Sequence, residues 1–156
     1  FGAFGEEVSP LADRARAYAE RTFELDRIEE GRTRRERLES RLERAVRKGR
    51  DDIAASYEAQ LVVPPFPTAA GHAWAVWQRI RRRKGSGPNG HAPVEWPDID
   101  AFARMTGVIL LPIDLSLLED FDDMFLKKMA EDIKPLDGSD LKDRLKELGR
   151  KHQKGE

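Results

Sequence analysis

The sequence predicts an all-α fold, with a long N-terminal helical hairpin or arm followed by a small domain of three to four helices. Apolar residues recur at steps of three and four in every periodic segment, which is the spacing of one helix face. Charged residues make up 37% of the chain and hydrophobic residues 39%, a balance typical of long helices that are exposed on several sides. Prolines and glycines fall between the periodic segments, where helices begin and end. We therefore expect more than half of the chain to be helical and no sheet to form.

Residues 9–62 are predicted to form the hairpin. The first helix begins at Ser9-Pro10, residue types that favour a helix start, and ends before Gly49, which can adopt a left-handed C-cap conformation. A return helix over residues 51–61 has only about three turns and cannot cover the whole apolar stripe of the first helix. The first part of that stripe should therefore bind a partner or a second copy of the chain. Its candidate contact residues are Leu11, Tyr18, Leu25 and Ile28.

Residues 63–134 are predicted to form the small helical domain, and residues 135–156 a C-terminal helix and tail. The proline-rich segment 62–67 separates the domain from the arm, because prolines cannot continue a helix. Helices are expected at about 68–84, 96–107 and 113–131. Their bulkiest apolar residues should form the core, namely Trp74, Trp77, Ile99, Phe102, Leu118 and Phe125. The apolar run 108–111 is expected to be a buried connector, since no second strand exists to pair with it.

The composition leaves several kinds of chemistry without support. The chain has no cysteine, which excludes disulfides, thiolate catalysis and cysteine-ligated metals. None of the three histidines has a carboxylate at metal-binding spacing, and the glycines of residues 85–90 do not form a phosphate-binding loop. The acidic cluster from Asp114 to Asp123 lacks the spacing and the glycine of a calcium loop. We therefore predict a protein that binds other macromolecules, with no catalytic site, no metal and no cofactor.

Charge is segregated along the chain, although the formal net charge is only −1. Residues 63–97 carry five Lys or Arg and one Glu, whereas residues 98–138 carry four basic and ten acidic residues. This pattern suits docking to a partner of mixed charge, or self-association. The cations crowd the end of one predicted helix, where Arg79, Arg82 and Arg83 are candidate partner contacts. The helix dipole explains such a cluster equally well, and a phosphate backbone is a further possible ligand.

One acidic residue, Asp122, stands apart from its neighbours in the acidic segment. It lies between Leu118 and Phe125 on the expected inner face of its helix. Two interpretations remain open at this stage. Asp122 either pairs with an arginine from the preceding helices or is simply exposed.

Residues 64–130 contain a series of short motifs. In chain order they are Pro64-Pro65, Trp74 and Trp77 with the trailing arginines, the Gly-rich loop, Ile99-Asp100-Ala101-Phe102-Ala103-Arg104 with Gly107, and Leu118, Asp122 and Phe125-Leu126. This region resembles a family of small proteins encoded among the tail genes of long-tailed phages and prophages, grouped with the tail-assembly chaperones. That family has a tryptophan helix, an I-x-A-Y/F-A-R helix ending in glycine, and a closing helix with one acid before an aromatic residue. Residues 9–62 and the final helix from Ser139 are not part of that pattern.

The resemblance implies a non-enzymatic protein that holds tape-measure and tail-tube proteins before they polymerise. Its partners would be those phage proteins or copies of itself, without nucleic acid or membrane, in the cytoplasm of a bacterial host. One alternative is a structural virion component at the capsid surface or the head–tail junction, which packs through its long helix. A second alternative, a DNA-binding accessory factor, rests only on the arginine cluster, and the acidic helix that follows would repel DNA.

Overall fold

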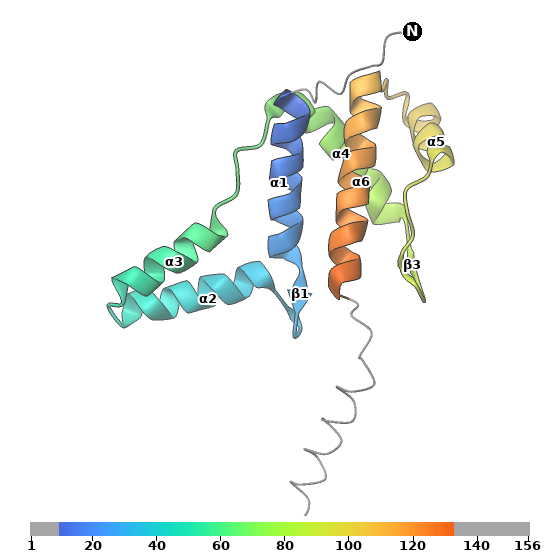
Figure 1. Ribbon diagram of the computed structural model, residues 1–156. Coiled ribbons are helices and arrows are strands. Elements are labelled where there is room, and N and C mark those ends of the chain that lie inside the picture. The colour runs from blue at the N-terminus through green and yellow to red at the C-terminus, as the bar shows by residue number, and fades with distance from the viewer. Residues whose placement is uncertain (1–9, 133–156) are drawn as a thin grey trace, which may run out of the picture.

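The computed structural model describes residues 10–132, and this part of the chain is mostly helical, as the sequence predicts. The elements are α1 (Pro10–Asp26), α2 (Arg34–Arg47), α3 (Asp51–Leu61), the short 3-10 helix η1 (Thr68–Ala70), α4 (Gly71–Arg83), α5 (Trp96–Thr106) and α6 (Pro112–Asp132) (Figure 1). The final helix expected from Ser139 lies outside the described residues. The expectation that no sheet forms is wrong in detail, because two antiparallel pairs of two-residue strands are present.

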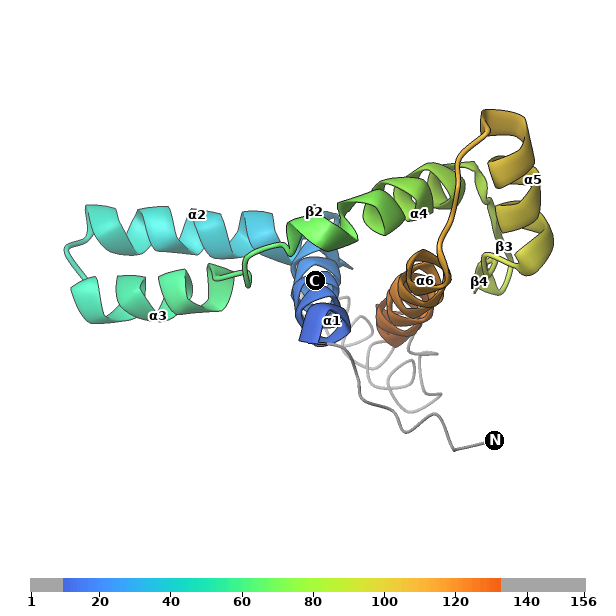
Figure 2. The same ribbon diagram turned by 90° about the horizontal axis from the view of Figure 1, so that it is seen from above.

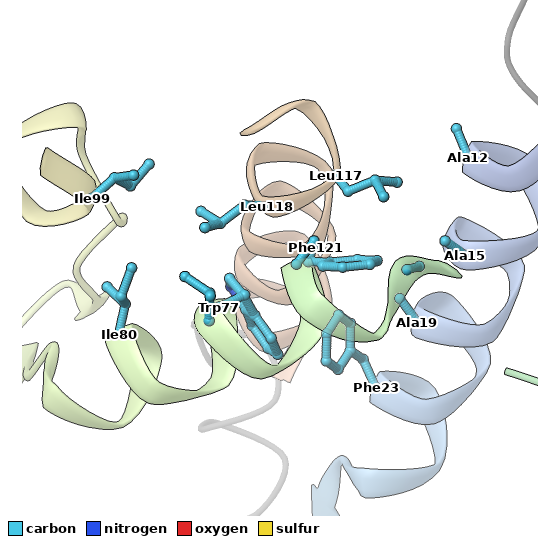
Figure 3. Close-up of a cluster of buried hydrophobic side chains, with 13 residues drawn as sticks. Ala12, Ala15, Ala19, Phe23, Trp77, Ile80, Ile99, Leu117, Leu118 and Phe121 are labelled. Carbon is cyan, nitrogen blue, oxygen red and sulfur yellow. The ribbon is translucent and has the colours of Figure 1, made fainter. Parts of the chain in front are cut away.

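The core of the protein is built from α1, α4 and α6. Helices α1 and α6 lie side by side and run in the same direction, and α4 crosses them (Figures 1 and 2). Figure 3 shows Phe121 of α6 between Trp77 of α4 and the small residues of α1. Ala15 and Ala19 are fully buried, and the absence of a larger side chain at these positions lets α1 approach α6 closely.

Aromatic rings fill much of this core. The ring of Trp74 stacks on Phe23 at 5.7 Å between centroids and meets Phe121 edge to face at 4.9 Å. Trp77 also contacts Phe23, at 5.2 Å. Tyr18 packs edge to face on Phe66, which belongs to the proline-rich segment, at 4.8 Å. Such pairs add directional contacts to the burial of apolar area and help to fix how the helices cross.

The buried cluster takes residues from both sides of the boundary expected at the prolines. Ala12, Ala15, Ala19 and Phe23 of α1 belong to the same cluster as the core residues of α4 and α6. Helix α1 is therefore part of the body of the protein rather than of a separate arm.

The hairpin that does form is shorter than expected and consists of α2 and α3. These helices lie side by side and project from the body, away from α5 (Figure 2). Thr33 caps α2 in a reciprocal pair of hydrogen bonds with Glu36, and Gly49 adopts the left-handed conformation expected of it, with φ of +64°. Few residues of the two helices are buried, namely Leu38, Ala45 and Ala54.

A tight turn separates α1 from α2 and accounts for the shorter hairpin. Glu30 and Gly31 both have positive φ, +53° and +81°, and link β1 (Ile28–Glu29) to β2 (Arg32–Thr33). A non-glycine residue at positive φ costs energy, but the flanking strand pair and surrounding ion pairs hold this turn in place. The periodic pattern continues across Gly31 in the sequence, so the pattern alone does not reveal the turn.

Several charged groups tie the projecting hairpin to α1. Glu24 of α1 forms an ion pair with Arg34 at 3.0 Å, and Asp26 forms another with Arg35 at 3.3 Å. At the other end of the hairpin, Arg21 donates hydrogen bonds to the carbonyl oxygens of Gln60 and Val62. Both ends of the hairpin are therefore attached to the same helix of the body.

Helix α5 and the connector after it form the side of the molecule opposite the hairpin (Figure 2). Gly107 ends α5 in the left-handed conformation expected from the sequence, with φ of +70°. The connector 108–111 is not a strand, but the expectation that it is buried is wrong in part, because Ile109 is 80% and Leu111 57% exposed. The connector follows the molecular surface, where the Ile109 carbonyl oxygen lies 3.0 Å from Nε2 of His72 at the start of α4.

Candidate functional site

A buried ion pair joins α4 to α6. Nη1 of Arg81 donates a hydrogen bond to Oδ1 of Asp122 at 3.0 Å, and Nε1 of Trp77 donates to the same oxygen at 3.0 Å. The side chains of Arg81 and Asp122 are only 7% and 4% exposed. Of the two interpretations of Asp122 left open by the sequence, the pairing with a preceding arginine is confirmed.

The same ion pair fixes the loop between α4 and α5. The second carboxylate oxygen of Asp122 accepts a hydrogen bond from the backbone N–H of Val94 at 2.8 Å, and Nη2 of Arg81 donates to the Ala92 carbonyl at 2.6 Å. This loop contains β3 (Ser86–Gly87) and β4 (Gly90–His91), which pair with each other. The guanidinium of Arg81 also lies over the ring of Phe125, 5.1 Å from its centroid. The network thus sets the position from which the chain enters α5.

A groove of about 640 Å³ lies between the C-terminal half of α4 and α5. It is lined by Arg79, Ile80, Arg82, Arg83, Lys84, Asp98, Ala101, Phe102, Met105 and Thr106. Its α4 wall is mainly cationic and its α5 wall mainly apolar. We call it the α4–α5 groove and take it as the candidate functional site.

One end of the α4–α5 groove is electrically neutralised. Nζ of Lys84 lies 2.6 Å from Oδ2 of Asp98. The hydrogen bond from Lys84, followed by one from the backbone N–H of Glu95, holds the pKa of the Asp98 carboxyl below its usual value. This pair links the end of α4 to the start of α5, so Lys84 is already occupied by an internal partner.

The remaining cations of the α4–α5 groove have no anionic partner in the part of the chain that the structure describes. Among residues 10–132, none of Arg79, Arg82 and Arg83 forms an ion pair, and Arg82 and Arg83 are exposed. The guanidinium of Arg79 lies over the ring of Phe102, 5.2 Å from its centroid. Next to Phe102 along the groove, Met105 is 87% exposed. The α4–α5 groove therefore offers unpaired guanidinium groups beside an uncovered apolar side chain.

The sequence-predicted contacts fall in two separate places. Arg79, Arg82 and Arg83 come together in the α4–α5 groove, whereas the four candidates of residues 9–62 lie on α1 or just after it. The expectation that the α1 stripe is left uncovered is wrong for Leu25, which is fully buried, and wrong in part for Leu11 and Tyr18, which are partly buried. Ile28 is exposed, but it follows the end of α1 in β1. The structure therefore favours the arginines over the α1 stripe as an accessible contact surface.

The six residues predicted to form the core all lie in or against the buried cluster. Trp77, Ile99 and Leu118 are buried, and Trp74, Phe102 and Phe125 are partly buried beside them. The residue that sequence reasoning missed is Met105. Its spacing of three from Phe102 places both on one side of α5, and that spacing was the available signal.

Neither a metal centre nor a membrane span is found in the described part of the chain. Residues 10–132 contain no group of three or more His, Asp or Glu side chains placed to hold a metal ion. No helix between these residues combines the length and the apolar character that crossing a membrane requires. In comparisons with known proteins, no family model, curated protein or solved structure matches the chain.

Proposed function

We propose that this protein is a non-enzymatic assembly factor of a long-tailed phage, which holds tape-measure and tail-tube proteins before they polymerise. The first support is the resemblance of residues 64–130 to the tail-assembly chaperones. The tryptophan helix and the single acid of that pattern are represented here by Trp77 and Asp122, and Arg81 belongs to the arginine cluster that follows the tryptophans. These three residues form one buried network, so a pattern of short motifs corresponds to a coherent structural unit.

The observation that carries the proposal is the α4–α5 groove. Three of its cations, Arg79, Arg82 and Arg83, form no ion pair within residues 10–132, and its α5 wall carries an exposed Met105. The groove is wide enough for several side chains of a partner. An open surface of this kind suits reversible capture of a protein segment, because charge speeds the encounter and exposed apolar groups supply contact area. Reversible capture is what a factor that releases its client on assembly requires.

The test is whether the protein is present in purified mature particles of the phage or prophage that encodes it. The protein should co-purify with tape-measure and tail-tube proteins when it is tagged and expressed with the neighbouring tail genes. Mass spectrometry should find it in the lysate and not in the mature particles. A stoichiometric presence in the particles would refute the proposal.

A second candidate function, a structural virion component, is favoured by the projecting hairpin. Helices α2 and α3 extend from the body and expose Val46 and Ile53, which are 58% and 36% accessible. A projecting helical pair with exposed aliphatic residues can pack between repeated copies in a shell or a ring. A stoichiometric amount in the particle would support this candidate.

A further inference from the structure

We propose that the α4–α5 groove binds an acidic amphipathic helix of a partner protein. The acidic stripe of the bound helix would lie against α4, and its apolar stripe would lie against α5. This inference rests on the proposed function and adds the chemistry of the segment that is held.

The charge of the partner follows from the α4 wall. Arg82 and Arg83 follow Arg79 by three and four residues, so all three lie on one side of α4 within about one turn. The nearby acid Asp98 is already bound to Lys84 and to the backbone N–H of Glu95. Carboxylates one turn apart on a partner helix would match this row of guanidinium groups, which bind carboxylates with two parallel hydrogen bonds.

The apolar stripe of the partner follows from the α5 wall. Phe102 and Met105 are three residues apart and line the groove with Ala101. Methionine is flexible and polarisable, so an exposed Met105 can fit aliphatic side chains of several shapes. A ligand that satisfies both walls needs an acidic row beside an apolar row. A helix laid in a groove provides that arrangement.

The apolar wall also decides between a protein segment and a nucleic acid. A phosphate backbone would leave Met105 without a partner. Arg79 already covers one face of the Phe102 ring, so that face is not free to stack on a base. Trp96, the exposed aromatic residue of α5, does not line the groove. On the exposed side of α5, Asp100 pairs with Arg104 at 2.8 Å, which adds no net positive charge there.

The test is a binding titration of the full chain by fluorescence anisotropy with three labelled probes. The first is a helical peptide of about 15 residues, with a row of Glu beside a row of Leu. The second peptide has Gln in place of every Glu, and the third probe is a single-stranded oligodeoxythymidylate of similar length. The wild-type chain should bind the Glu peptide at least about tenfold more tightly than the other two probes.

Two double variants separate the groove from general attraction to positive charge. Arg82→Glu with Arg83→Glu should weaken binding of the Glu peptide by about tenfold or more, because it reverses two contacts of the groove. Arg41→Glu with Arg44→Glu changes the charge of the exposed hairpin equally and should alter binding by less than about twofold. Met105→Lys should weaken the Glu peptide although it adds positive charge. Thermal melting checks that all variants are folded.

Several outcomes would overturn the inference. Tighter binding of the oligonucleotide, lost in the groove variant, would make the groove a nucleic-acid site. Equal losses of affinity for the Glu peptide in the groove and hairpin variants would show that positive charge anywhere on the surface attracts the peptide. If the wild-type chain does not bind the Glu peptide, the groove does not dock such helices. A dimer in sedimentation that the groove variant abolishes would make a second copy of this chain the occupant.

Failure of this inference can be told apart from failure of the proposed function. If the groove variant still co-purifies with tape-measure and tail-tube proteins, the assembly role stands and the groove is not its binding site. If the wild-type chain binds the Glu peptide through the groove but is stoichiometric in mature particles, the groove assignment stands and the chaperone role fails.

Discussion

Replacing Asp122 with Ala should destabilise the protein more than any other single change of a charged residue in the described structure. The substitution leaves the guanidinium of Arg81 buried without its counter-ion, and removing one partner of a buried ion pair costs about 3–5 kcal/mol. It also removes the acceptor for the indole N–H of Trp77 and the backbone N–H of Val94. Each unsatisfied buried donor costs about 1–3 kcal/mol, less where water can enter.

These costs share one site and do not add in full, so we expect a loss on the order of 4–6 kcal/mol. Domains of this size have an unfolding free energy of about 5–15 kcal/mol, so the variant should lose a large part of its stability and unfold at a much lower urea concentration. Urea denaturation followed by tryptophan fluorescence measures the loss, because Trp74 and Trp77 lie in or against the core. Asp122→Asn, which keeps the shape and one acceptor oxygen, should fall between the wild type and Asp122→Ala.

A matched control is available on the same helix. Asp120 also pairs with an arginine, Arg16, at 2.8 Å, but the two side chains are 28% and 40% exposed. Pairs that are open to water contribute about 0–1 kcal/mol, so Asp120→Ala should cost little. If Asp120→Ala and Asp122→Ala shift the urea midpoint equally, with the same slope, the buried network does not hold α4, α6 and the loop together as argued.

Three further substitutions test the core, the hairpin and the acidic helix. Trp77→Ala should lower the free energy of unfolding by about 3–5 kcal/mol in the same urea experiment, because it leaves a cavity between α1, α4 and α6. A urea midpoint equal to that of the wild type would contradict the core described above. Leu38→Ala should open the hairpin locally, since few buried residues hold it. Hydrogen exchange should then lose protection in residues 34–61 and keep it in α4 and α6. Asp123 lies on the exposed side of α6, and partial desolvation followed by the charges of Asp122 and Asp120 raises its pKa. A raised pKa in the folded state favours folding at low pH, and that contribution is lost as the pH rises through the folded pKa. Asp123→Asn should therefore raise the melting temperature at pH 7 and change it little near pH 3, and the reverse pattern would contradict this sign.

The helices of the C-terminal half of the described structure could be predicted because their signals are local. Gly107 ends α5 as expected, and the apolar spacing of α4 and α6 identifies the faces that carry Trp77 and Leu118. Pairing of Asp122 with an arginine was one of the two interpretations that the sequence left open, because an acid on an apolar face needs a partner, but the sequence did not identify Arg81 as that arginine. In each case a few neighbouring residues contain the information.

The course of the N-terminal half could not be predicted because its determinants are not local. The turn after α1 places Glu30 at positive φ, a conformation for which the residue type gives no signal. The stripe that includes Leu11 and Tyr18 suggested an arm, yet the buried face of α1 also contains alanines outside that stripe, such as Ala12 and Ala19. Alanine carries little pattern information because it is common on both buried and exposed helix faces.

The α4–α5 groove shows how these two kinds of information combine at a site. Its arginines were identified from the sequence as candidate contacts. Which of them can bind a partner depends on which arginine forms the buried ion pair in the core. Arg81 forms that ion pair with Asp122, whereas Arg79, Arg82 and Arg83 form no ion pair within the described residues. The inner residues of α4 and α6, including Trp77, Arg81 and Asp122, therefore hold the scaffold. Partner choice should depend instead on the outer arginines and Met105, so exchanging them should change the bound segment without changing the fold.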